Sequence, residues 1–121
     1  MPDCNFIILY VESPSRSAEF YSALLERSPV ENSPHFALFV LDSGLKLGLW
    51  QQQDVQPAIE SLGVSGEIDF LLPDKASVNN TCQDWKDRGL TIIQQPTTME
   101  FGYTFVALDP DGNRLRAFAA S

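Results

Sequence analysis

Few side chains in this chain are of the types that perform nucleophilic or metal chemistry. Its 121 residues include one histidine, His35, and two cysteines, Cys4 and Cys82. No Cys-x-x-Cys pair is present, so the cysteines predict neither a disulfide framework nor a zinc cluster. His35 follows Pro34 and has no evident partner for nucleophilic catalysis. We therefore expect a solvated loop histidine, a reduced core Cys82 and no catalytic residue.

The charge balance excludes several classes of partner. Sixteen acidic residues against eight lysines and arginines give a net charge of -8, which repels nucleic-acid phosphates and anionic lipids. The apolar runs are far shorter than the roughly 20 residues that span a bilayer, and residues 1–5 lack the basic flank of a signal peptide. The sequence thus predicts a cytoplasmic protein that binds neither nucleic acid nor membrane.

The elements that must position any site occur twice along the chain. A shift of about 61 positions superimposes Val11 on Leu72, Ser13 on Asp74 and Tyr21 on Cys82. Each copy begins with an apolar strand-like run, continues into a capped helix and ends in β-rich segments. We therefore predict a single domain, residues 1–121, made of two repeats. Module 1 spans residues 5–51, the linker 52–65 and module 2 66–118.

Capping and turn residues predict the elements within each copy. Ser13-Pro14 and Asp74 are N-cap signals for the two helices, and Pro29 is expected to stop the first. Glycine-bearing turns predict two hairpins, residues 36–41 with 45–50 and residues 103–108 with 114–118. Other expected features are a strand over 90–94, a loop between Pro96 and Gly102, and a candidate short helix over Val55 to Leu62.

Several motifs resemble the vicinal oxygen chelate superfamily, which includes glyoxalase I, extradiol dioxygenases, fosfomycin-resistance enzymes and bleomycin-resistance proteins. They are Val11-x-Ser13, Phe20-Tyr21-x-x-Leu24-Leu25 and the run Leu108-Asp109-Pro110-Asp111-Gly112-Asn113. The resemblance covers essentially the whole chain. It implies an α+β fold in which two βαβββ modules form a cupped mixed β-sheet of half-barrels, with the helices on the outer face.

The resemblance also implies four metal-ligand positions, two in each module. In this sequence they are Phe6, Gly48, Glu67 and Arg116. Phe6 and Gly48 have no donor atom, and Arg116 is a permanent cation that repels a metal ion. We therefore expect no metal and no other cofactor, and a charge-assisted pair between Glu67 and Arg116 instead.

The same positions predict a binding face. Strand alternation brings ten residues to the face that holds metal in the related enzymes. Aromatic rings stack on planar ligands, a glycine leaves room for one, and several charges do not belong in a packed interior. The alternative that the rings are simply core stays open. The candidate ligand-binding residues are Phe6, Ile8, Tyr10, Gly48, Trp50, Glu67, Asp69, Arg114, Arg116 and Phe118.

Within the superfamily the chain looks most like the metal-free bleomycin- or phenazine-resistance type. That resemblance implies a homodimer that binds a planar aromatic small molecule unmodified and confers resistance by sequestration. The acidic balance favours a neutral or cationic ligand over an anionic one. The alternatives are a metal-dependent enzyme of the glyoxalase or dioxygenase type and an interaction module without a small ligand. The resemblance leaves open whether modules pair within one chain or are exchanged between chains.

Overall fold

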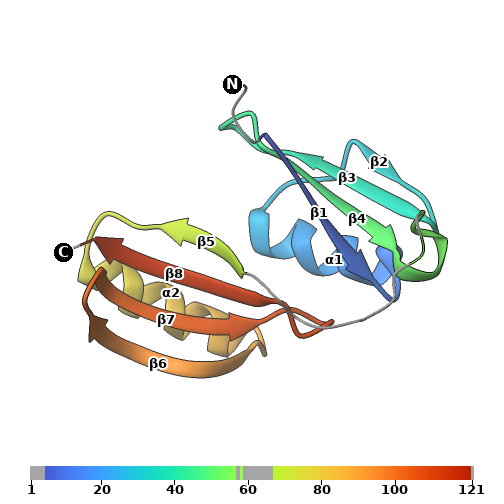
Figure 1. The fold of residues 1–121 in the computed structure, drawn as a ribbon. Helices are drawn as coiled ribbons and strands as arrows, with labels where there is room; N and C mark the ends of the chain where they lie inside the picture. Colours follow the sequence, from blue (N-terminus) through green and yellow to red (C-terminus); the bar gives the residue numbers. More distant parts are fainter. Residues whose placement is uncertain (1–4, 57, 59–66, 121) are drawn as a thin grey trace. The chain divides into compact units, whose positions relative to one another are not determined.

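The protein has the α+β fold of two βαβββ modules that the repeat predicts. The computed structural model describes residues 5–56, 58 and 67–120, which divide into two compact units, one within Met1–Leu62 and one within Gly63–Ser121. Each unit is a four-stranded mixed sheet with one helix (Figure 1). Five of the eight residues of the candidate helix Val55 to Leu62 lie outside the described residues. The described start of the linker is a 3₁₀ helix, Gln52–Asp54.

Both sheets are built in the same order. In unit 1 the strands are ordered β1-β4-β3-β2, and in unit 2 they are ordered β5-β8-β7-β6. The first strand of each unit pairs in parallel with the last, and the other pairs are antiparallel. The elements are β1 (Phe6–Val11), α1 (Pro14–Leu25), β2 (Glu31–Asn32), β3 (Phe36–Val40), β4 (Lys46–Gln51), β5 (Glu67–Leu71), α2 (Lys75–Asp87), β6 (Thr91–Met99), β7 (Gly102–Leu108) and β8 (Arg114–Ala120).

The two helices begin where the sequence predicts. Ser13 Oγ accepts a hydrogen bond from the Arg16 amide at 3.2 Å, and Asp74 Oδ1 accepts one from the Ser77 amide at 2.8 Å. These bonds satisfy amides that would otherwise have no partner in the first turn. The first helix ends at Leu25, four residues before Pro29, because Glu26 takes a left-handed conformation with φ 53°. Neither helix of the described residues is long and apolar enough to cross a membrane.

Each helix covers one face of its sheet and forms the core there. In unit 1 Tyr21, Phe39 and Leu49 are fully buried, and in unit 2 Phe105 and Leu115 are. Trp85 of α2 contacts Phe105 edge to face at 5.2 Å between ring centroids. Cys82 is buried beside them, as expected.

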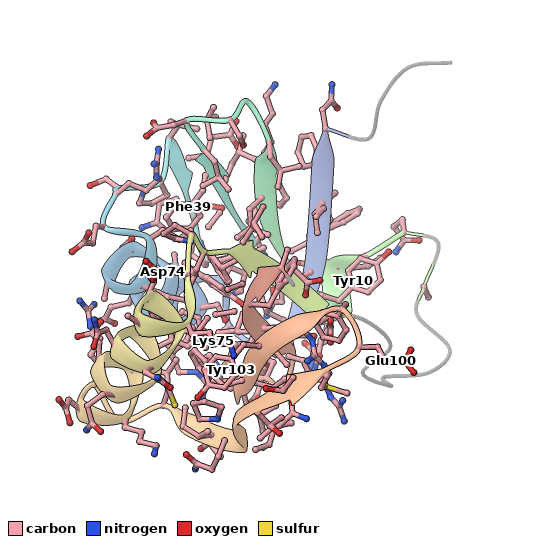
Figure 2. All side chains as sticks on the ribbon, turned by 90° about the vertical axis from the view of Figure 1, so that its left-hand side faces the viewer. Tyr10, Phe39, Asp74, Lys75, Glu100 and Tyr103 are labelled. Carbon is pink, nitrogen blue, oxygen red and sulfur yellow. The ribbon has the colours of Figure 1, made fainter. Side chains whose placement is uncertain are left out.

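The helix side of β7 also carries Tyr103. Figure 2 shows Lys75 beside Tyr103, with the ammonium 5.5 Å from the ring centre, and the Tyr103 hydroxyl donates to Asn79 Oδ1 at 2.8 Å. Since side chains alternate along a strand, Thr104 points to the opposite face, which the helix leaves uncovered.

Two elements differ from the expectation. The loop predicted between Pro96 and Gly102 is shorter than expected, because β6 continues to Met99 and only residues 100–101 form a turn. β6 is an edge strand whose pairing shifts register between Gln94 and Thr97, and an edge strand with a bulge tolerates the missing N–H of Pro96. The short strand β2, which pairs with Leu38 and Ala37, was not predicted.

We expect Gly102→Ala to destabilise unit 2 by about 2–4 kcal/mol, the scale of overpacking combined with backbone strain. A Cβ at this position lies 2.1 Å from the Ala119 carbonyl oxygen, and Gly102 has φ +150°. The matched control is Gly44→Ala, which has positive φ but nothing within 4 Å. Chemical denaturation of both variants measures the difference. Equal losses of stability in Gly102→Ala and Gly44→Ala would contradict this expectation and would show that strand β8 shifts to accommodate the added methyl group.

Candidate functional site

The two sheets present equivalent positions on the faces that the helices leave uncovered. Ile8 pairs with Gly48 in unit 1, and Asp69 pairs with Arg116 in unit 2. Because both parallel pairs have the same register, Gly48 and Arg116 hold equivalent positions, as the family resemblance implies. Two further strand pairs of unit 1 have equivalents in unit 2. The pair Phe6–Lys46 corresponds to Glu67–Arg114, and the pair Tyr10–Trp50 corresponds to Leu71–Phe118.

Unit 1 presents an uncovered face of apolar and aromatic side chains. We call it the aromatic face. Phe6, Ile8 and Tyr10 alternate along β1 with exposed fractions of 41%, 41% and 48%, whereas Val11, on the helix side, is fully buried. Within this unit the three side chains are therefore not part of the core. The aromatic face consists of Phe6, Ile8, Tyr10, Phe36, Leu38, Gly48 and Trp50.

Trp50 is half-buried and contacts Tyr10 edge to face, with ring centroids 6.5 Å apart and planes at 71°. Edge-to-face contact fixes both rings while leaving ring surface accessible. This pair joins β1 to β4 at one end of the aromatic face.

Gly48 lies beneath two rings. A Cβ at this position meets Phe36 Cζ at 2.9 Å and Phe6 Cε1 at 3.3 Å. The sequence interpretation left this space to a ligand, whereas the structure fills it with the ring of Phe36. Phe36 was absent from the predicted set. Its signal was available in the hairpin, because the Phe36–Trp50 pairing brings both side chains to one face.

Unit 2 presents charged groups where unit 1 presents rings. We call this uncovered face the polar face. Arg116 Nε donates to Glu67 Oε1 at 2.8 Å, so the expected pair is formed. Arg116 Nη1 donates to Thr104 Oγ1 at 3.2 Å and to Gln94 Oε1 at 3.4 Å. The polar face consists of Glu67, Asp69, Gln94, Thr104, Arg114, Arg116 and Phe118, of which sequence reasoning missed Gln94 and Thr104.

An aromatic pair lies beside this network. The Arg116 guanidinium carbon is 5.5 Å from the centre of the Phe101 ring, and Phe101 contacts Phe118 edge to face at 5.8 Å. Phe101 is 44% exposed and follows the end of β6. It was not predicted, because the sequence placed a loop there. The Arg116 side chain is only 14% exposed, so rings and hydrogen bonds hold it in place.

The two carboxyl groups of β5 have pKa values shifted in opposite directions. The hydrogen bond from Arg116 lowers the pKa of Glu67. Partial burial raises the pKa of Asp69, and a hydrogen bond with Glu67 and its negative charge raise it further. The hydrogen bond between the two carboxyl groups thus favours the protonated form of Asp69 and the ionised form of Glu67.

His35 is exposed, as expected, but it has an acidic partner that the sequence did not reveal. Its Nδ1 lies 2.6 Å from Asp54 Oδ2 and 3.2 Å from Gln51 Oε1. The hydrogen bond with Asp54, followed by that with Gln51 and the charge of Asp54, raises the pKa of His35. The partner lies 19 residues away in the sequence, in the 3₁₀ helix after β4, so local patterns gave no signal for it.

The four positions at which the resemblance implies metal ligands do not fit a divalent cation. Phe6 and Gly48 carry no lone-pair donor for a metal, and Arg116 is a permanent cation whose Nε and Nη1 groups bond Glu67, Gln94 and Thr104. Across the part of the chain that the structure describes, no three His, Cys, Asp or Glu side chains come together as ligands.

Comparisons with known proteins agree with this architecture. Residues 4–117 match the family model described as the Glyoxalase/Bleomycin resistance protein/Dioxygenase superfamily. The chain is 30% identical over 115 residues to the phenazine antibiotic resistance protein EhpR of Enterobacter agglomerans, an alignment covering 93% of this chain and 88% of that protein.

Solved structures show the same fold. Protein ATC0852 of Agrobacterium tumefaciens, determined in solution by NMR, is 49% identical with a TM-score of 0.91, covering 100% of this chain and 99% of that one. A glyoxalase/bleomycin resistance protein/dioxygenase family enzyme from Burkholderia phytofirmans PsJN is 19% identical with a TM-score of 0.84, covering 99% and 100%. The second likeness shows the fold alone.

We expect Asp69→Asn to raise the free energy of unfolding at pH 7 by up to about 1 kcal/mol, a small figure because water screens this exposed side chain. The neutral amide of asparagine at position 69 donates a hydrogen bond to Glu67 and removes the negative charge that Asp69 places beside it. The pKa of Asp69 is higher in the folded than in the unfolded chain. The Asp69 carboxyl therefore stabilises the fold below its unfolded pKa, and this stabilisation is lost as pH rises through its folded pKa. The gain should therefore shrink as pH falls towards 4.

Urea unfolding of both proteins between pH 4 and 7 measures this difference. The control is Asp87→Asn on α2, which removes the same charge while keeping an oxygen to accept from Gln83. An Asp69→Asn variant that is less stable than the native chain at pH 7 would contradict the unfavourable interaction between the negative charges of Glu67 and Asp69.

Proposed function

We propose that this chain, which belongs to the Glyoxalase/Bleomycin resistance protein/Dioxygenase superfamily, binds a planar aromatic small molecule and sequesters it unmodified. The observation that carries the proposal is the aromatic face of unit 1. Phe6 and Tyr10 are 41% and 48% exposed there, and large exposed aromatic side chains gathered on one face are typical of ligand contacts. The 30% identity to a phenazine antibiotic resistance protein supports the same class of activity.

The donor set favours binding over metal-assisted catalysis. Two of the four expected ligand positions, Phe6 and Gly48, lack donors, and Arg116 supplies a cation at a third. Phe6 now contributes ring surface to the aromatic face. Contact between rings and a planar ligand adds about 0.5–1.5 kcal/mol per pair beyond the area buried, so a few such contacts supply useful affinity without a metal.

The proposal includes a homodimer. Within each unit the parallel pair leaves one strand at the edge of its sheet, β1 in unit 1 and β5 in unit 2. Edge strands and exposed apolar side chains are surfaces that a second copy commonly covers. A homodimer also agrees with the resistance-type proteins that the sequence resembles.

We expect Trp50→Ala to weaken binding of phenazines or quinones about 10- to 100-fold, equivalent to roughly 1–3 kcal/mol. The chain has two tryptophans, so Trp85→Phe leaves Trp50 as the only reporter for fluorescence quenching. Affinity for Trp50→Ala itself is measured calorimetrically.

Trp50→Ala should unfold close to the native melting temperature, because Trp50 is only half-buried. The matched control, Trp85→Ala, removes a ring that is 6% exposed and should cost about 3–5 kcal/mol of stability. Unchanged affinity together with a collapsed melting temperature in Trp50→Ala would remove Trp50 from the binding site.

We also expect purified protein to retain far less than one nickel, zinc, manganese or iron ion per chain after dialysis, because the expected ligand positions lack converging donors. Elemental analysis measures the metal content, and titration with the same aromatic probes after EDTA treatment should give unchanged affinity. Stoichiometric metal whose removal also abolishes probe binding would favour the metal-dependent enzyme.

A further inference from the structure

The polar face of unit 2 carries complementary hydrogen-bonding groups that the fold does not use. Arg116 donates hydrogen bonds from Nε to Glu67 and from Nη1 to Thr104 and Gln94. Its Nη2 has no acceptor among the described residues, and it is not one of their buried unpaired atoms. Two charged N–H groups of a well-held guanidinium are therefore accessible to a ligand.

Asp69 supplies the matching acceptor. It is the direct strand partner of Arg116, so both side chains leave the same face of the sheet. Among the described residues its only hydrogen-bonding neighbour is the Glu67 carboxyl, which leaves carboxylate oxygen atoms for other donors. An accessible donor and an accessible acceptor thus lie on neighbouring strands.

The charges of this face select against an ionic ligand. Arg114 and Arg116 on β8 lie opposite Glu67 and Asp69 on β5, so the arginines and carboxylates offset one another. An anion gains from Arg116 but is repelled by the two carboxylates, and a cation experiences the reverse. A neutral group that both accepts and donates hydrogen bonds meets neither repulsion. The nearby rings of Phe101 and Phe118 offer apolar surface for the rest of such a molecule.

We propose that the polar face recognises a neutral aromatic ligand carrying a carbonyl beside an N–H or O–H, as in an aromatic carboxamide or a hydroxyketone. The carbonyl accepts from Arg116 Nη2, and the adjacent N–H or O–H donates to Asp69. Phe101 and Phe118 contact the ring system. This inference rests on the proposed function, because it specifies which kind of aromatic molecule the protein sequesters.

The test compares 2-naphthamide, methyl 2-naphthoate and 2-naphthoate by calorimetric titration at pH 7. All three carry the same rings and a carbonyl, but only the amide has a neutral donor. We expect the amide to bind about tenfold more tightly than the ester, the scale of one hydrogen bond to a charged group. The anion is expected to bind no better than the ester.

Two variants assign the preference to individual side chains. Asp69→Ala should reduce the amide-to-ester affinity ratio to about one, on the same scale of one hydrogen bond. Arg116→Lys should weaken both probes about tenfold, because both present a carbonyl. The ratio is independent of the folded fraction, since both probes titrate the same sample. The control Arg88→Gln removes an arginine that pairs with Asp84 on α2 and should leave the ratio unchanged.

Equal affinity of amide and ester in the native chain would overturn the inference while aromatic binding itself still supported the proposed function. Tighter binding of the naphthoate would overturn it in favour of an oxyanion site. Failure of all three probes would also overturn it, and the proposed function would then depend on the phenazine and quinone titrations of Trp50→Ala.

Discussion

A single helix can cover only one face of a four-stranded sheet, and this limit organises both units. Alternation along each strand sends every second side chain to the uncovered face. In unit 1 Leu47 and Leu49 of β4 pack towards α1, so Gly48 and Trp50 point away. Alternate side chains of each strand therefore pack in the core. The side chains between them can differ in type without any change in the backbone.

The two units apply the same scaffold to different chemistry. Position for position, Phe6 corresponds to Glu67, Ile8 to Asp69 and Gly48 to Arg116. These differences between the units leave the packing of each core unchanged, because none of these residues lies on the helix side of its sheet. Unit 1 therefore offers rings, and unit 2 offers hydrogen-bonding groups, at equivalent positions of the same scaffold.

Local patterns were sufficient for the scaffold but not for the details of the faces. Ser13 and Asp74 cap their helices within three residues, and the Glu67–Arg116 pair followed from the family resemblance. Gln94 and Thr104 were missed because their positions depend on pairing between strands, whereas the predicted hairpin already carried the signal for Phe36. Asp54 was missed beside His35 for a similar reason, since the contact spans 19 residues. Pro96 suggested a loop because an edge strand cannot be recognised before the strand order is known.

The contact between Phe36 and Gly48 restricts how this surface can change over generations. Any side chain introduced at position 48 displaces a ring 2.9 Å from its Cβ, so substitutions at positions 36 and 48 have non-additive effects. The order in which they arise then matters: a smaller residue at 36 first makes room, whereas a larger one at 48 first causes a clash.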